Sequence, residues 1–130
     1  MLLLDTHVWW WSVSEPAHLS SIAVERILAT RPSQRAIASI SLWELAMLES
    51  KQRIELDIPV AVWLSRAVKK TGITIIDLTP TIAADSCNLP GSFHKDPADR
   101  IIVATARIHG LTLLTRDQKI LEYDHVQCVW

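Results

Sequence analysis

The sequence has few cysteines, no long apolar runs and no excess of charge of either sign. Its 130 residues include only two cysteines, Cys87 and Cys128. Neither belongs to a CxxC motif and no second pair exists, which argues against a disulfide framework or a thiolate zinc site. We therefore expect both thiols to be reduced core residues of a cytoplasmic protein.

Membrane segments are also missing from the sequence. No apolar stretch approaches the roughly 20 residues that a membrane-spanning helix needs. The first residues carry no basic segment, and Asp5 interrupts the apolar run that follows Met1. We therefore expect neither a membrane anchor nor a signal peptide.

The total charge is close to zero. Lys and Arg number 13 against 14 Asp and Glu, a formal net charge of −1. This balance argues against a strongly basic protein that wraps nucleic acid. It leaves open a nucleic-acid enzyme whose carboxylates gather in one site. With 49% hydrophobic and 21% charged residues, the composition is that of one ordinary globular domain over residues 1–130.

Short apolar runs alternate with stretches of helical periodicity. The runs favour strands at 2–4, 36–40, 73–76, 111–114 and 126–130. The helical stretches lie at 19–27, 60–68 and 99–110, the last ending on a glycine. This alternation predicts an α/β fold, a mostly parallel central sheet with helices on both faces.

Acidic residues follow the predicted strands. Asp5 and Asp117 come directly after the first and fourth runs, and Glu44 lies about one turn after the second. Asp96 and Asp99 open the helix that leads into the fourth run. Because ligands of such sheets bind beyond the carboxyl ends of the strands, we expect these carboxylates to cluster. Hard divalent cations such as Mg²⁺ and Mn²⁺ would neutralise them.

Each carboxylate also has a structural interpretation. Asp96 before Pro97 suits a helix N-cap, Asp117 suits the cap of a short helix, and Glu44 suits a solvated helix face. Asp5 is hardest to explain in this way, because a carboxylate beside three leucines needs a partner. Asp77, which ends the run "ITIID", is expected to be a surface or turn residue.

Taken together, three stretches resemble the PIN-domain family of ribonucleases, in particular the VapC-type toxins of bacterial toxin–antitoxin pairs. "LLLDTHVWWW" is similar to the family opening, in which a strand delivers an aspartate. "ASISLWELAMLESKQRI" is similar to the second motif, with Glu44 as its glutamate. The most specific stretch is "FHKDPADRIIVATARIHGLTLLTRD", in which an aspartate precedes a helix, a glycine, a strand and a Thr-x-Asp ending.

This resemblance implies a three-layer α/β/α sandwich forming a single PIN domain. It also implies an endoribonuclease in which one or two Mg²⁺ or Mn²⁺ ions activate water to hydrolyse RNA phosphodiesters. The metal-site and catalytic carboxylates would be Asp5, Glu44, Asp99 and Asp117, with Asp96 as an additional acidic residue.

Supporting roles follow from the same comparison of motifs. Thr115 would orient a carboxylate or water through its hydroxyl, and Thr6 would do likewise for Asp5. The basic residues beside the carboxylates are candidates for contacts with RNA phosphates, with a solvated helix face as the alternative. They are Lys95, Arg100, Arg116 and Lys119. His7 and His94 flank the site; they either contact phosphate or tune the carboxylates, or they are structural or surface residues, which is the favoured interpretation.

The resemblance further implies two protein partners, a VapB-type antitoxin whose C-terminal segment lies near the active site, and a second copy of the chain. The three consecutive tryptophans, Trp9–Trp11, are candidates for the surfaces that contact these partners. Consecutive side chains on a helix point about 100° apart, so we expect at least one of these indoles to face a groove or a partner.

Two other functions remain open. A receiver-like signalling domain would use Asp77 as its phosphoacceptor, but it requires an acidic pair after the first strand, where this chain has Asp5-Thr6-His7. The second open function is that of a non-catalytic binding module with the PIN fold, since the fold alone does not determine the function.

Overall fold

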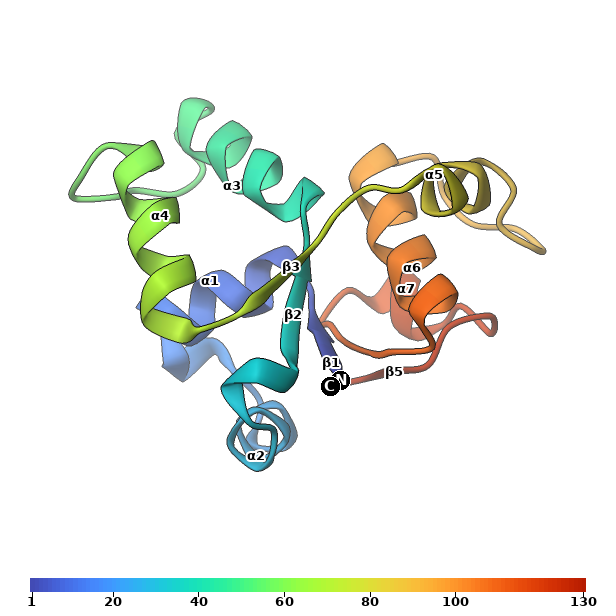
Figure 1. Cartoon of the computed structure of the whole chain (residues 1–130), viewed down its shortest axis with the longest axis horizontal. Coiled ribbons are helices and arrows are strands. Elements are labelled where there is room, and N and C mark those ends of the chain that lie inside the picture. Colours follow the sequence, from blue (N-terminus) through green and yellow to red (C-terminus); the bar gives the residue numbers. More distant parts are fainter.

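The computed structural model describes residues 1–130, with five parallel strands at its centre (Figure 1). The strand order is β3-β2-β1-β4-β5. The strands are β1 Leu2–Leu4, β2 Arg35–Ala38, β3 Thr74–Ile76, β4 Thr112–Leu114 and β5 Cys128–Val129. Four of them are shorter than the apolar runs predict or shifted by a residue, because the runs continue into turns and helices. Ile40, for example, already belongs to a helix.

Seven α-helices and two short 3-10 turns connect the strands. The helices are α1 Thr6–Ser14, α2 Ser21–Ala29, α3 Ile40–Ser50, α4 Val60–Thr71, α5 Pro80–Cys87, α6 Pro97–His109 and α7 Gln118–Leu121. The 3-10 turns are Pro16–His18 and Pro32–Gln34. Gly110 ends α6 with φ 61°, a left-handed conformation that glycine adopts without steric cost.

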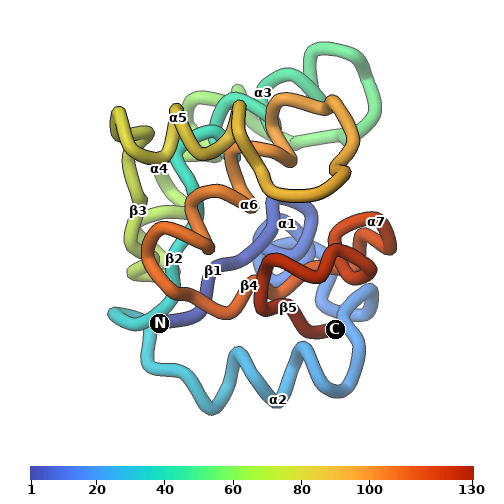
Figure 2. The backbone as a smooth tube through the Cα atoms, turned by 90° about the vertical axis from the view of Figure 1, so that its right-hand side faces the viewer, coloured from blue at the N-terminus to red at the C-terminus, as the bar shows by residue number.

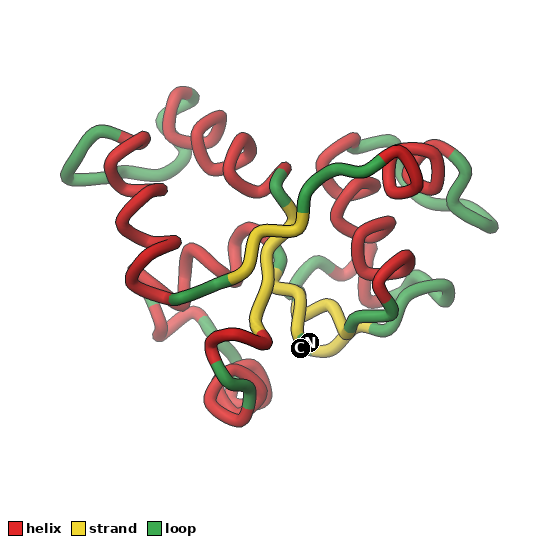
Figure 3. Tube along the Cα trace, viewed as in Figure 1, coloured by secondary structure: helices red, strands yellow, loops and turns green.

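The helices form a layer on each side of the sheet. Helices α1, α3 and α4 cover one face, and α5 and α6 cover the other (Figures 1 and 3). Along β1, Leu2 and Leu4 join the core on the α1 side, while Leu3 joins the core on the α6 side. This alternation explains why the strand is apolar throughout. The predicted three-layer α/β/α sandwich is confirmed.

Several elements meet at the carboxyl edge of the sheet. Helices α1, α3 and α7 begin directly beyond β1, β2 and β4. Helix α2 lies at the opposite end of the molecule, below the sheet in both views (Figures 1 and 2). Asp77 follows β3, the outermost strand on its side, and is exposed. The sheet order therefore separates Asp77 from the carboxylates that follow β1 and β4.

Two further expectations concern the cysteines and membrane segments. Cys128 is partly buried, but Cys87 is exposed at the end of α5, so its predicted core position is wrong. It lies on the outer face of that helix, whose buried residues are Ile82 and Ser86. No helix combines the length and apolar character required to cross a membrane.

Candidate active site

All five predicted acidic residues line one pocket of about 540 Å³ at the carboxyl edge of the sheet. The acidic residues are Asp5, Glu44, Asp96, Asp99 and Asp117. The rest of the lining consists of His7, Trp11, Met47, Leu48, Arg53 and Arg116. We call this cavity the acidic pocket.

Asp5 is held by two short hydrogen bonds rather than by a basic side chain. Its side chain caps α1, where Oδ1 accepts from the Thr6 N–H at 2.8 Å. Oδ2 accepts from the Thr115 hydroxyl at 2.6 Å. Burial of Asp5, which is only 8% exposed, raises its pKa, while these two donors act in the opposite direction.

Thr115 links two carboxylates of the pocket. Its hydroxyl donates to Asp5 and accepts from the backbone N–H of Asp117 at 3.0 Å. The side chain is fully buried, so this hydrogen-bonding arrangement is fixed by packing. The geometry agrees with the predicted orienting role of Thr115.

The expectation that the hydroxyl of Thr6 orients Asp5 is wrong, because another group of Thr6 makes this contact. The Thr6 hydroxyl donates to the Ser41 hydroxyl at 2.8 Å, and only its backbone N–H reaches Asp5. Ser41, which is fully buried, was not identified from sequence, because a serine in the first turn of a helix carries no distinctive signal.

Burial and repulsion from neighbouring carboxylates make ionisation of Asp5, Glu44 and Asp99 unfavourable. Burial is the largest cause of the raised pKa of Glu44. Burial, followed by the charges of Asp5, Asp96, Glu44 and Asp117, raises the pKa of Asp99 to about 8. A cation between these carboxylates would favour their charged forms.

Asp96 and Asp117 also cap helices, as their structural interpretation predicts. Asp96 Oδ1 accepts from the Ala98 N–H at 3.0 Å at the start of α6. Asp117 Oδ1 accepts from the Lys119 N–H at 2.8 Å at the start of α7. Capping occupies Oδ1 in both residues, so Oδ2 remains for a ligand.

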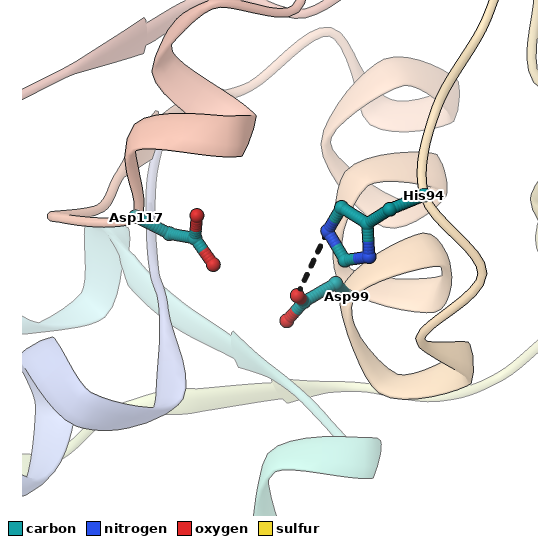
Figure 4. Close-up of side chains that lie close together, drawn as sticks. All are labelled: His94, Asp99 and Asp117. Atoms are coloured by element: carbon teal, nitrogen blue, oxygen red, sulfur yellow. Dashed lines mark ion pairs between the residues drawn. The ribbon is translucent and has the colours of Figure 1, made fainter.

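His94 brings a nitrogen to the same group of side chains (Figure 4). Its Nε2 lies 3.1 Å from Asp99 Oδ2. One donor atom from each of His94, Asp99 and Asp117 falls within 4.8 Å of the others. On the other side of the ring, Nδ1 accepts from the Asp96 N–H at 3.3 Å.

Two arginines supply the positive charge of the acidic pocket. Arg116 follows β4, and its Cζ lies 5.7 Å from the centre of the Trp11 ring, a cation–π distance. Arg53, which the motifs did not indicate, reaches the pocket from the turn after α3. Lys95 and Lys119 are exposed and do not line this pocket.

Arg100 has a structural role that disagrees with the predicted phosphate contact. Its Nε donates to the Ser86 carbonyl at 2.7 Å. Its NH1 group donates to the carbonyls of Phe93 and His94, both at 3.0 Å. These bonds engage the guanidinium and tie the segment that precedes α6 to α5.

The three consecutive tryptophans separate as helical geometry predicts. Trp9 and Trp10 are buried, whereas Trp11 is partly exposed and lines the acidic pocket. The Trp11 ring stacks on His18 at 5.3 Å. The expectation that one indole faces a groove is confirmed for Trp11.

The donor set fits a hard divalent cation. Carboxylate oxygens from four separate segments converge on the pocket, and burial raises the pKa of Asp5, Glu44 and Asp99 despite the two arginines in its lining. Mg²⁺ and Mn²⁺ prefer oxygen ligands of this kind.

Comparison with known proteins identifies the family of the chain. The family model described as PIN domain matches residues 2–126. Ribonuclease VapC22 of Mycobacterium tuberculosis is 41% identical over 124 residues, which are 95% of this chain and 92% of that protein.

Solved structures show the same fold. A toxin–antitoxin complex from Klebsiella pneumoniae superposes with a TM-score of 0.68 at 26% identity, covering 100% of this chain and 97% of that chain. VapBC2 from Rickettsia felis, bound to a DNA fragment from its promoter, gives a TM-score of 0.72 at 16% identity over 99% and 98% of the two chains. The chain therefore belongs to the PIN-domain family and is of the VapC type.

Proposed function

We propose that the chain is a Mg²⁺- or Mn²⁺-dependent endoribonuclease and the toxin of a toxin–antitoxin pair. The observation that carries this proposal is the convergence of Asp5, Glu44, Asp99 and Asp117 in one pocket. A relative with 41% identity named as a ribonuclease supports the reaction class.

Asp5, Glu44, Asp99 and Asp117 would hold one or two ions, with Asp96 as a further acidic neighbour. When bound, the metal supplies activation of water and neutralisation of charge on the phosphate. The protein's own part is to fix the carboxylates. Thr115 and the Thr6 N–H hold Asp5, so that its position does not depend on the ion.

Arg116 and Arg53 are the cations placed to contact RNA phosphates, because both line the acidic pocket. The Trp11 ring supports Arg116 on one side. Lys95 and Lys119, outside the pocket, are candidates for contacts farther along the strand. Hydrolysis would leave a 5′-phosphate and a 3′-hydroxyl.

The test compares RNA cleavage by the wild type and by Asp5→Asn, with and without Mg²⁺. We expect cleavage to require the ion and to be lost in the variant. Asp77→Asn is the matched control, because Asp77 is an exposed aspartate after a strand but lies outside the pocket. Undiminished cleavage by Asp5→Asn would refute the proposal.

We also propose a VapB-type antitoxin and a second copy of the chain as partners, and a cytoplasmic location. Structures of toxin–antitoxin complexes among the relatives support the antitoxin as a partner.

Calorimetric titration with Mn²⁺ distinguishes the proposed enzyme from a non-catalytic binding module with the PIN fold. A module without a metal site shows no binding that depends on Asp5 and Asp117.

A further inference from the structure

We propose that His94 is a positioning residue, which donates its Nε2–H to Asp99 and thereby fixes that carboxylate for metal binding. This inference rests on the proposed function, since it assigns Asp99 to the metal site. It assigns His94 a hydrogen bond to a carboxylate rather than a bond to the metal, and it defines which atom of His94 acts.

The tautomer of His94 follows from its contact with the backbone. Nδ1 accepts a hydrogen bond from the Asp96 N–H at 3.3 Å. A ring nitrogen that accepts carries no proton, so in a neutral imidazole the proton is on Nε2. Nε2 is therefore a donor and has no lone pair for a metal ion, although its distances to Asp99 and Asp117 resemble those of a metal site.

Asp99 is the acceptor nearest to this N–H. Nε2 is shielded from solvent and makes no hydrogen bond of good angle in the metal-free chain, but Asp99 Oδ2 lies only 3.1 Å away. Figure 4 shows the imidazole edge facing this carboxylate. A small rotation of the Asp99 carboxylate completes the bond, and a buried donor without a partner favours that rotation.

The rest of the chain holds the imidazole in place. Arg100 binds the carbonyl of His94 and that of Phe93. The ring of Phe93 packs against that of His94 at 4.4 Å and against that of Tyr123 at 4.8 Å. These contacts fix the backbone and the ring independently of Asp99, which is the arrangement expected of a residue that orients a ligand.

The two carboxylate oxygens of Asp99 would therefore have different roles. Oδ2 faces His94, and Oδ1 makes no hydrogen bond within the chain, so it is left for the ion. Without His94 the carboxylate would be free to rotate among the other acidic groups. Loss of such an orienting partner typically weakens metal affinity by about 10- to 100-fold.

The experiment measures Mn²⁺ affinity by calorimetry for three variants that separate the two functions of the ring. His94→Gln retains a donor near the position of Nε2. His94→Asn retains an acceptor near the position of Nδ1 for the Asp96 N–H but cannot reach Asp99. His94→Ala retains neither, and His109→Ala is the control, since His109 is exposed at the far end of α6.

We expect His94→Gln to bind Mn²⁺ within about threefold of the wild type, and His94→Asn and His94→Ala to bind at least tenfold more weakly. Thermal melting in chelator identifies any loss of folding in each variant. Wild-type affinity in His94→Asn, or equal losses in His94→Gln and His94→Ala, would overturn the inference. If the wild type shows no Mn²⁺ binding that depends on Asp99, the proposed function fails instead.

Discussion

At the scale of single residues, the buried carboxylate of Asp5 shows how the site is stabilised before any ion binds. Desolvation opposes its charge, and two donors at 2.6 and 2.8 Å offset part of that cost. Hydrogen bonds to a charged group contribute more than those between neutral groups. Thr115 is therefore as much a part of the site as the carboxylate it holds.

Substitution of Thr115 by Val tests this role, because the side chain keeps its shape and loses its hydroxyl. We expect a further rise in the pKa of Asp5, a loss of about 1–3 kcal/mol in stability and roughly tenfold weaker Mn²⁺ binding. Thr115→Ser should restore most of the affinity, and Thr112→Val in the preceding strand β4 should leave it unchanged. Full Mn²⁺ affinity in Thr115→Val would contradict the role.

At the scale of elements, helix N-termini carry the acidic residues to the site. Asp5, Asp96 and Asp117 cap α1, α6 and α7. In a long helix such as α6, the positive end of the dipole also favours a carboxylate at this position. The structural and functional interpretations of these residues are therefore compatible, because the cap occupies only one of the two carboxylate oxygens and all three residues line the pocket.

Asp96 is the residue at which the two roles can be separated. Asp96→Asn preserves the cap, so stability should stay within a few tenths of a kcal/mol, whereas Asp96→Ala should cost about 1 kcal/mol. We expect less than a threefold change in Mn²⁺ affinity for Asp96→Asn. Melting curves and calorimetry measure both effects, and a tenfold loss of affinity in Asp96→Asn would make Asp96 a direct ligand.

Much of this element-level organisation could be predicted from sequence. The Asp-Pro pair and Gly110 give the ends of α6, and the apolar runs give strands within a few residues. Long-range hydrogen bonds could not be predicted in the same way. The bonds of Arg100 to α5 and of Thr6 to Ser41 join segments 14 and 35 residues apart, and no local pattern indicates them.

At the scale of the whole molecule, the order of the strands decides which carboxylates meet. Local patterns place Asp5, Asp77 and Asp117 alike, within three residues of the end of an apolar run. Only the order β3-β2-β1-β4-β5 puts β1 beside β4 and leaves β3 at the edge. The resemblance to a known family indicated which carboxylates belong together, but neither it nor the periodicity predicted the strand order that brings them together.

The crowding that results makes the stability of the whole chain depend on pH and on metal. Folding raises the pKa of Asp99 from 3.8 to about 8, so the folded metal-free protein retains a proton that the unfolded chain releases. Stability should therefore fall as the pH rises from about 4 to 8. Glu44 and Asp5 shift in the same direction.

Thermal melting in chelator at pH 5 and pH 8 should show this loss, on the order of 2 kcal/mol at the higher pH. Saturating Mg²⁺ should restore stability most at pH 8, where protons compete least for the carboxylates; an ion at 100 times its Kd contributes about 2.7 kcal/mol. Asp99→Asn should flatten the pH dependence, and Asp77→Asn should not. Equal or higher metal-free stability at pH 8 in the wild type would show that the carboxylates ionise without a cation, which would remove the electrostatic argument for a metal site.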